Sequence, residues 1–453
     1  MLTARLSQIE HVCQASLQGE DVLVRGMAID SRRVRPGNLF LAFAGARVDG
    51  HDFLPQARAA GAAAALVAHF VDDPLPQLQV SDVQAAAADI ARWHHRRLQL
   101  LTVGVTGSNG KTTVKNMIRA ILEELGPTLA TSGNYNNELG LPLTLAELGS
   151  EHQYAVLEMG AGKPGDIAEL CRIARPDVSV VTNVGDAHLA QFGRREAIAG
   201  TKGAIYAELA PGGTAVINAD DPFAPLFRQL AVAHRQLEFG QHPAAVWAGD
   251  CQMGPQTRFM LHTPAGEIEV QLAFLGEHNV RNALAAAAVG HAAGATLPQI
   301  AAGLARAQPE ARRLQLRQTE RALLVDDSYN ANPASLAAAL KAVTPLASRR
   351  WLVLGDMLEL GPGAEALHAQ SGQLARAAGF ERIYAIGPLS SVAARAFGEG
   401  GRGFATRDGL LTALREDLAE GPAPLLLVKG SRSSSMDQVV DALLGEEDAC
   451  CSG

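Results

Sequence analysis

Continuous apolar runs alternate with amphipathic segments along the chain from residue 101 onward. The runs cover residues 101–105, 154–159, 178–184 and 214–220. Parallel strands that are covered on both faces have this nearly unbroken apolar character. Segments with helical periodicity separate the runs, the first over 112–125. The alternation predicts an open, mostly parallel α/β sheet.

The alternation of apolar runs and helical segments resumes after a polar segment at 307–313. It predicts a second, Rossmann-like α/β unit with a helix at 334–343 and strands at 323–327, 351–356, 382–387 and 425–430.

The N-terminal part is shorter and less regular. Residues 61–70 are apolar, whereas 73–79 contain two prolines and predict a connection. A helical pattern follows over 83–98. We therefore expect three α/β domains, over residues 1–82, 83–312 and 313–453.

Composition narrows the class of protein. The chain has 453 residues, with 39 Lys and Arg against 47 Asp and Glu, so the net charge is 39 − 47 = −8. This balance argues against a broad basic face and a nucleic-acid partner. No apolar run approaches the ~18 residues of a membrane helix, and the first residues lack the apolar stretch of a signal peptide. The five cysteines are scattered, which disfavours a disulfide framework. We expect a cytoplasmic, water-soluble protein.

Several predicted strands end in a polar side chain. Open parallel sheets bind ligands beyond the carboxyl ends of their strands, although polar residues also simply mark where strands stop. The residues at these ends are Glu158, Asn183, Asp220, Asp327, Asp356 and Lys429.

The strongest single motif lies between the 101–105 strand and the following helix. Glycines in such a loop allow backbone N–H groups to surround phosphate oxygens at a helix N-terminus. Lys111 is expected to reach the β- and γ-phosphates of ATP, and the Thr112 hydroxyl to join the ligands of Mg²⁺. The general pattern has Gly where this chain has Val105. The loop comprises Gly107, Ser108, Asn109, Gly110, Lys111, Thr112 and Thr113.

The phosphate loop alone does not identify the reaction, whereas further motifs indicate it. The shortened phosphate loop resembles that of the Mur ligases, which lack the same first glycine. Further matching segments follow in the family's order, at 134–142, 157–160, 182–188, 278–282 and 429–432. The resemblance covers the whole chain and implies a three-domain ligase that uses ATP to form an amide bond.

Four stretches resemble one branch of this family, at 30–32, 49–53, 327–333 and 354–361. Members of that branch join D-alanyl-D-alanine to UDP-N-acetylmuramoyl-tripeptide through an acyl phosphate in peptidoglycan precursor synthesis. We expect this chain to be a monomer. The resemblance places the UDP end on the first domain and the dipeptide on the last. The substrate-binding residues it implies are Ser31, Arg32, Asp49, His51, Asn136, Asn137, Tyr329, Asn330, Asn332, Lys429 and Arg432.

The resemblance also implies two Mg²⁺ ions. Glu158 and His188 would bind Mg²⁺ beside Thr112, and Lys202, carbamylated, would help to hold the second ion. Taken alone, His188 fits a capping or core histidine, and Lys202 fits a solvated surface lysine. Carbamylation needs a neutral amine and therefore a lowered pKa.

For the nucleotide, the resemblance implies adenine contacts from Asn279 and Asn282, a ribose contact from Asp327 and a γ-phosphate contact from Arg313. Asn279 is equally suited to capping a helix. The family more often has Gly at position 312, which leaves Arg312 and Arg313 as alternatives for the phosphate contact. Read locally, this pair fits a solvated linker.

Local chemistry allows plainer readings elsewhere too. Asp49 and its neighbours fit an ordinary turn, and Asn330 and Asn332 fit a turn before Pro333.

Three other functions compete with the favoured one. They are a sister ligase that adds a different amino acid, a folate-glutamylating ligase, and a nucleotide-dependent switch with no peptide acceptor.

Overall fold

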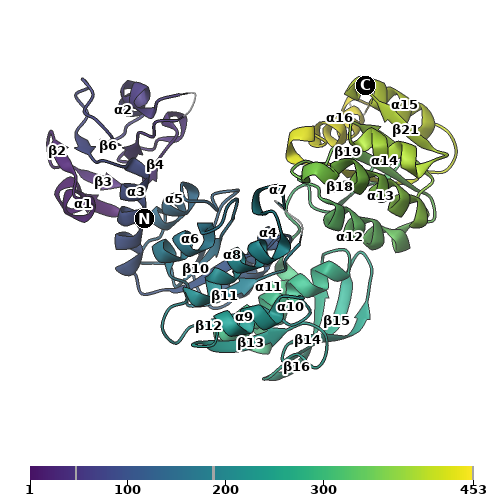
Figure 1. Ribbon diagram of the computed structural model, residues 1–453, viewed down its shortest axis with the longest axis horizontal. Coiled ribbons are helices and arrows are strands. Elements are labelled where there is room, and N and C mark those ends of the chain that lie inside the picture. Colours follow the sequence, from purple (N-terminus) through teal and green to yellow (C-terminus); the bar gives the residue numbers. More distant parts are fainter. Residues whose placement is uncertain (46–47, 186–188, 451–453) are drawn as a thin grey trace.

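A six-stranded, all-parallel sheet forms the middle of the molecule (Figure 1). Its strand order is β13-β12-β11-β8-β10-β9. The four apolar runs predicted in this region are strands β8, β10, β11 and β12, so the parallel sheet is confirmed. The strands are β8 Leu101–Thr106, β9 Thr128–Ala130, β10 Tyr154–Glu158, β11 Val178–Val181, β12 Thr214–Asn218 and β13 Arg235–Phe239. The structure, a computed structural model, describes residues 1–45, 48–185 and 189–450.

Helices cover both faces of this sheet. One core encloses apolar side chains of α4, α10 and α11, and a second encloses those of α5, α6 and α8. Both cores are built mostly from Ala, Val, Leu and Ile, as the low aromatic content requires. The helices are α4 Lys111–Leu122, α5 Gly140–Ala146, α6 Asp166–Ala174, α7 Leu189–Phe192, α8 Arg195–Ala207, α9 Ala224–Leu230, α10 Glu277–Ala292 and α11 Leu297–Arg306.

A three-stranded antiparallel sheet that the sequence reading missed is attached to this domain. Its strands are β14 Trp247–Gln252, β15 Thr257–Thr263 and β16 Gly266–Leu272. Their buried residues join the core beneath α10 and α11.

The N-terminal domain contains a five-stranded sheet of order β2-β7-β6-β5-β4 and a separate pair, β1-β3. β7 lies inside the segment predicted as a connection, which was therefore wrong for residues 77–79. Helix α3 contributes to the core of this domain together with residues of α5. The elements are β1 Thr3–Arg5, α1 Leu6–Cys13, β2 Ser16–Gln18, β3 Leu23–Arg25, β4 Met27–Ala28, η1 Ser31–Arg33, β5 Leu39–Leu41, η2 Gly50–Phe53, α2 Leu54–Ala59, β6 Ala64–Val67, β7 Gln77–Gln79 and α3 Val83–Arg96.

The C-terminal domain has a six-stranded sheet of order β17-β18-β22-β19-β20-β21, in which only β17 is antiparallel. The four predicted strands here are β18, β19, β20 and β22, which confirms the Rossmann-like expectation. The elements are β17 Gln315–Gln318, β18 Leu323–Asp327, α12 Pro333–Val343, η3 Thr344–Leu346, β19 Arg350–Gly355, η4 Gly361–Gly363, α13 Ala364–Ala377, β20 Arg382–Ile386, α14 Ser390–Phe397, β21 Gly401–Phe404, α15 Arg407–Leu418, β22 Leu425–Lys429, η5 Arg432–Ser434 and α16 Asp437–Cys450.

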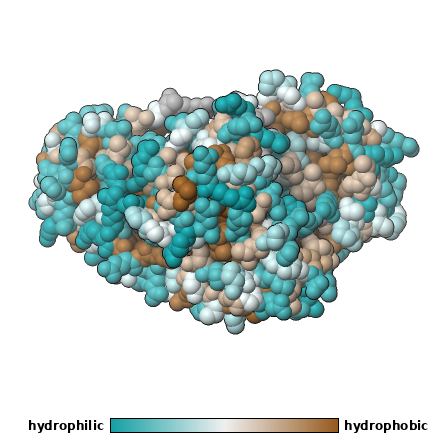
Figure 2. All heavy atoms as spheres, turned by 60° about the horizontal axis from the view of Figure 1, so that its bottom comes forward, coloured by the Kyte–Doolittle hydropathy of each residue, from teal (hydrophilic) through white to brown (hydrophobic). Residues whose placement is uncertain are grey.

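The N-terminal and C-terminal domains lie at opposite ends of the central one (Figure 1). On the face in Figure 2, apolar residues are scattered among hydrophilic ones rather than gathered in one broad patch. Among the described helices, none has the length and apolar character needed to cross a membrane.

Candidate nucleotide site at a domain junction

The phosphate loop connects β8 to α4, as the sequence predicts. Gly110 caps α4 with a φ of +81°, a conformation that L side chains rarely adopt. A Cβ on Gly107 would lie 1.9 Å from Thr182 Oγ1, so the loop packs too closely there for a side chain. Thr113 lies in the first turn of α4. The glycines therefore serve both the turn and its close packing.

The segment after β11 holds the loop in shape. Asn183 O accepts from the Ser108 N–H at 2.9 Å, and Asn183 Oδ1 accepts from the Asn109 N–H at 3.0 Å. Thr182 Oγ1 donates to Asn109 O at 2.6 Å. The polar strand end at Asn183 thus supports the phosphate loop directly.

Two lysines of α4 lie close to the loop. Lys111 Nζ donates to Gly107 O at 2.8 Å, and burial lowers the pKa of its ammonium while Glu158 opposes the shift. Lys115 is buried and donates to Thr131 O at 2.7 Å. The sequence reading missed Lys115, although it follows Lys111 by four residues and so shares a face of the helix.

Glu158 ends β10 and is buried, with only 3% of its surface exposed. Its Oε1 accepts from Asn136 Nδ2 at 2.8 Å, and its backbone N–H donates to Thr131 Oγ1 at 3.0 Å. Within the described residues, Oε2 is buried without a hydrogen-bond partner. An unpaired buried carboxylate oxygen suits a hard cation such as Mg²⁺.

Lys202 lies on α8 and is only 2% exposed, so the surface-lysine alternative is wrong. Burial, together with the charge of Lys111, lowers its pKa from 10.5 to about 7. A neutral amine is therefore accessible near neutral pH. The predicted ligand His188 lies outside the described residues. Within the described part of the chain, no cluster of three or more His, Cys, Asp or Glu is arranged to bind a metal.

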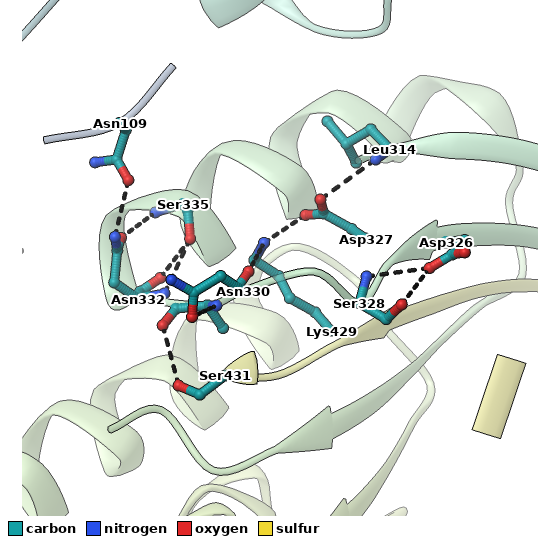
Figure 3. A network of polar contacts seen from close by, with 11 residues as sticks. Asn109, Leu314, Asp326, Asp327, Ser328, Asn330, Asn332, Ser335, Lys429 and Ser431 are labelled. Atoms are coloured by element: carbon teal, nitrogen blue, oxygen red, sulfur yellow. Dashed lines mark hydrogen bonds and ion pairs between the residues drawn. The ribbon is translucent and has the colours of Figure 1, made fainter. Parts of the chain in front are cut away.

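The C-terminal domain touches the phosphate loop through two side chains. Arg313 Nη2 donates to Thr112 Oγ1 at 3.3 Å, and its guanidinium stacks 4.3 Å from the Tyr329 ring centroid. Asn332 caps α12 and its Nδ2 donates to Asn109 Oδ1 at 2.8 Å (Figure 3). The loop therefore lies at the junction of two domains.

Arg312 points elsewhere. Its guanidinium forms an ion pair with Asp437 and another with Asp441 at 3.3 Å, both on α16. Its φ is +65°, which accounts for the Gly that the family often has at this position. Of the two alternatives, only Arg313 faces the phosphate loop.

Asp327 and Lys429, predicted to bind different ligands, are paired with each other (Figure 3). Lys429 Nζ lies 2.5 Å from Asp327 Oδ2 and donates to Asn330 O at 3.0 Å. Burial raises the pKa of Asp327, and Lys429 opposes that shift. The pair fixes the turn that carries Tyr329, Asn330 and Asn332. Arg432 lies 5.7 Å from the Tyr329 ring centroid.

Asn279 and Asn282 bind each other on α10. Asn282 Nδ2 donates to Asn279 Oδ1 at 2.9 Å, and Asn279 Nδ2 donates to Leu275 O at 2.8 Å. Asn282 Oδ1 lies 2.6 Å from the position of a Cβ on Gly110. These amides thus form a wall behind the phosphate loop, and their adenine contact stays a prediction.

The candidate UDP residues lie on the N-terminal domain, in two short 3₁₀ helices. Ser31 Oγ donates to Gln56 Oε1 at 2.8 Å, and the exposed Arg32 pairs with Asp30 at 2.8 Å. Asp49 caps the second helix, and its Oδ1 lies 2.5 Å from His51 Nδ1.

Both ring nitrogens of His51 are engaged, because Nε2 accepts from the Ala68 N–H at 2.9 Å. Asn137, predicted beside Asn136, accepts at 2.9 Å from the N–H of Gly140, the first residue of α5. Contact of these residues with substrate stays a prediction.

Comparison with known proteins places these features in a family. Three family models match consecutive segments, described as the Mur ligase family catalytic domain (residues 23–98), the Mur ligase middle domain (105–290) and the Mur ligase glutamate ligase domain (312–432).

The UDP-N-acetylmuramoyl-tripeptide–D-alanyl-D-alanine ligase of Escherichia coli is 40% identical over 455 residues, which cover 100% of both chains. The crystal structure of MurF from Acinetobacter baumannii has a TM-score of 0.93 at 35% identity and covers 98% of this chain and 99% of that one. MurF ligase from Thermotoga maritima in complex with ADP has a TM-score of 0.83 at 29% identity, with 94% and 98% covered. With matches along its whole length, this chain belongs to the Mur ligase family.

Proposed function

We propose that this protein is an ATP-dependent ligase that joins D-alanyl-D-alanine to UDP-N-acetylmuramoyl-tripeptide, giving the pentapeptide, ADP and phosphate. The observation that carries the proposal is the phosphate loop contacted by Arg313 and Asn332 of the C-terminal domain. A ligase must bring ATP, a carboxylate and an amine together, and a site shared by domains meets that need. The full-length likeness to ligases of this name supports the choice of substrates.

The first step transfers the γ-phosphoryl group to the terminal carboxylate of the tripeptide. Lys111 would bind the phosphates, and Arg313 would bind the γ-phosphate as charge develops on it. Mg²⁺, when bound, neutralises phosphate charge. Thr112 and Glu158 would hold one ion, and the unpaired Oε2 of Glu158 favours this assignment.

A carbamylated Lys202 would help to hold a second ion, and His188 is the remaining candidate ligand of Mg²⁺. The burial of Lys202 supports this chemistry, because the lowered pKa supplies the neutral amine that reacts with carbon dioxide. The product is an anionic oxygen ligand, which a hard cation prefers.

In the second step the dipeptide amine attacks the acyl phosphate and phosphate leaves. The turn at Tyr329, Asn330 and Asn332 would bind the dipeptide, and its contact with Asn109 would keep it close to the phosphates. Ser31 and Arg32 would hold the diphosphate of the UDP end, at the opposite end of the molecule. Water must be excluded meanwhile, since the acyl phosphate hydrolyses readily.

We expect a cytoplasmic monomer whose domains span residues 1–82, 83–312 and 313–453. Its task needs soluble ATP and a soluble nucleotide-linked peptide.

The test is phosphate release from Mg-ATP and UDP-N-acetylmuramoyl-tripeptide, with and without D-alanyl-D-alanine, together with the mass of the product. We expect release to require both substrates and the product to gain one dipeptide. A product that carries a single amino acid would identify a sister ligase, and release on folate substrates would identify the folate-glutamylating class. Release that is indifferent to any acceptor would identify a nucleotide switch.

A further inference from the structure

Arg313 is held on three sides. Its Nη2 donates to Thr112, and its plane stacks on Tyr329. On the third side lies Glu310, whose Oε2 is 3.7 Å from Arg313 Nε. This carboxylate is not part of any motif in the sequence.

The contact between Glu310 and Arg313 is built by the backbone. The Arg313 N–H donates to Glu310 O at 3.2 Å, which closes a turn and brings the two side chains together. Arg312, inside this turn, points away to α16 and so leaves the space to Glu310.

The two facing atoms of this pair are buried and lack hydrogen-bond partners among the described residues. They are Arg313 Nε and Glu310 Oε2. A charge-assisted hydrogen bond of about 2.9 Å would satisfy both atoms and requires an approach of only about 0.8 Å. A buried donor and acceptor that face each other are expected to pair.

The geometry of guanidinium gives this pair a consequence. Arginine carries five N–H donors in a rigid plane. When a carboxylate takes the Nε edge, the plane is fixed and the Nη groups remain available for another anion. The Nη2 of Arg313 already lies at Thr112, beside the phosphate loop.

We propose that Glu310 is a positioning residue that holds the Nε edge of Arg313, so that its Nη groups meet the terminal phosphate of ATP. The proposal rests on the proposed function for the identity of that anion. Glu310 does not itself touch substrate; it acts through Arg313.

The test uses Glu310→Gln in the full chain, which keeps the side-chain shape and removes its charge. Glu310 has 34% of its side chain exposed, so we expect the fold to survive. Initial rates of phosphate release are measured with ATP varied and then with dipeptide varied. We expect kcat/KM for ATP to fall about tenfold and KM for the dipeptide to stay within about twofold.

Two comparisons separate positioning from a general structural effect. Glu147→Gln removes the same charge from an exposed residue after α5, and we expect it to match the wild type within about twofold. In an Arg313→Ala background, Glu310→Gln should cost less than about twofold more, because the guanidinium that it would hold is absent. Equal behaviour of the Glu310 and Glu147 variants, or losses at 310 and 313 that multiply, would overturn the proposal.

Binding of a non-hydrolysable ATP analogue to the same variants keeps this test independent of turnover. A roughly fivefold loss of affinity in Glu310→Gln, but not in Glu147→Gln, supports positioning even if the wild type does not join the dipeptide. Unchanged analogue affinity in an active ligase would reject the role of Glu310 and leave the proposed function standing.

Discussion

Substitution of Gly110 by Ala tests how the phosphate loop is built. At a φ of +81°, a Cβ costs about 1–2 kcal/mol through backbone strain alone. The new Cβ would also lie 2.6 Å from Asn282 Oδ1. Turning that amide away would break its 2.9 Å bond to Asn279 and leave a buried polar group unpaired, at about 1–3 kcal/mol. The total is about 2–5 kcal/mol.

Gly165→Ala provides a matched control. Gly165 also caps a helix, α6, with a φ of +94°, but no described heavy atom lies within 4 Å of its Cβ position. It should therefore lose only about 1–2 kcal/mol, through strain. The excess of about 1–3 kcal/mol in Gly110→Ala favours a relaxed loop that Mg-ATP must return to its native shape, so Mg-ATP binding should weaken by at most roughly 5- to 150-fold.

The assays are urea unfolding for stability and calorimetric titration with Mg-ATP for affinity. We expect Gly165→Ala to bind Mg-ATP as the wild type does. Equal destabilisation of the two variants, with normal Mg-ATP binding by Gly110→Ala, would refute the role of the Asn282 wall.

Three further predictions concern charged groups of the site. Burial lowers the pKa of Lys202 to about 7, so this side chain takes up a proton when the protein unfolds at any pH between about 7 and about 10.5. The free energy of unfolding should therefore rise with pH by up to about 1.4 kcal/mol per unit relative to Lys202→Met, measured by urea unfolding at about pH 8 and about pH 9. Asn136→Ala removes the hydrogen bond to Glu158 Oε1, so the Mg²⁺ concentration that gives half-maximal phosphate release should rise about 10- to 100-fold. An unchanged Mg²⁺ titration would argue against Glu158 as a ligand of the ion. Arg312→Gly relieves a left-handed backbone position but loses partly exposed ion pairs, so the free energy of unfolding should change by less than about 1 kcal/mol and turnover should be retained. Arg313→Ala should lower kcat at least about 100-fold, and the reverse pattern in a kinetic assay would exchange the roles of the two arginines.

Local chemistry made much of this fold predictable. The central strands are apolar from end to end because both of their faces are buried, and the phosphate loop needs Gly and Lys at fixed spacing. Strands β14, β15 and β16 carry many exposed positions and do not give that signal, so they were missed. β7 was missed because it begins directly after Pro76 and has only three residues.

The candidate site was predicted less completely, since its key relations join distant parts of the chain. Only the folded structure separates Arg312 from Arg313, because the two neighbours diverge at a left-handed backbone position. Burial of Lys202 within α8 is likewise a tertiary property. Glu310 has no motif at all, and its significance follows from its distance to Arg313.

The contacts between domains suggest why the site is divided. Asn332 begins α12 with its own side chain and also binds Asn109 of the phosphate loop, so one residue links the C-terminal domain to the loop. Arg313 makes a second link, at the hydroxyl of Thr112. A nucleotide in the loop lies beside both contacts, because Thr112 is the expected Mg²⁺ ligand and Asn109 belongs to the phosphate loop. Binding of ATP and placement of the C-terminal domain are then linked, and each shifts the equilibrium of the other. Water destroys the acyl phosphate intermediate of this reaction. The coupling means that ATP binding shifts the position of the C-terminal domain, which carries the turn at Tyr329, Asn330 and Asn332, before the acyl phosphate forms.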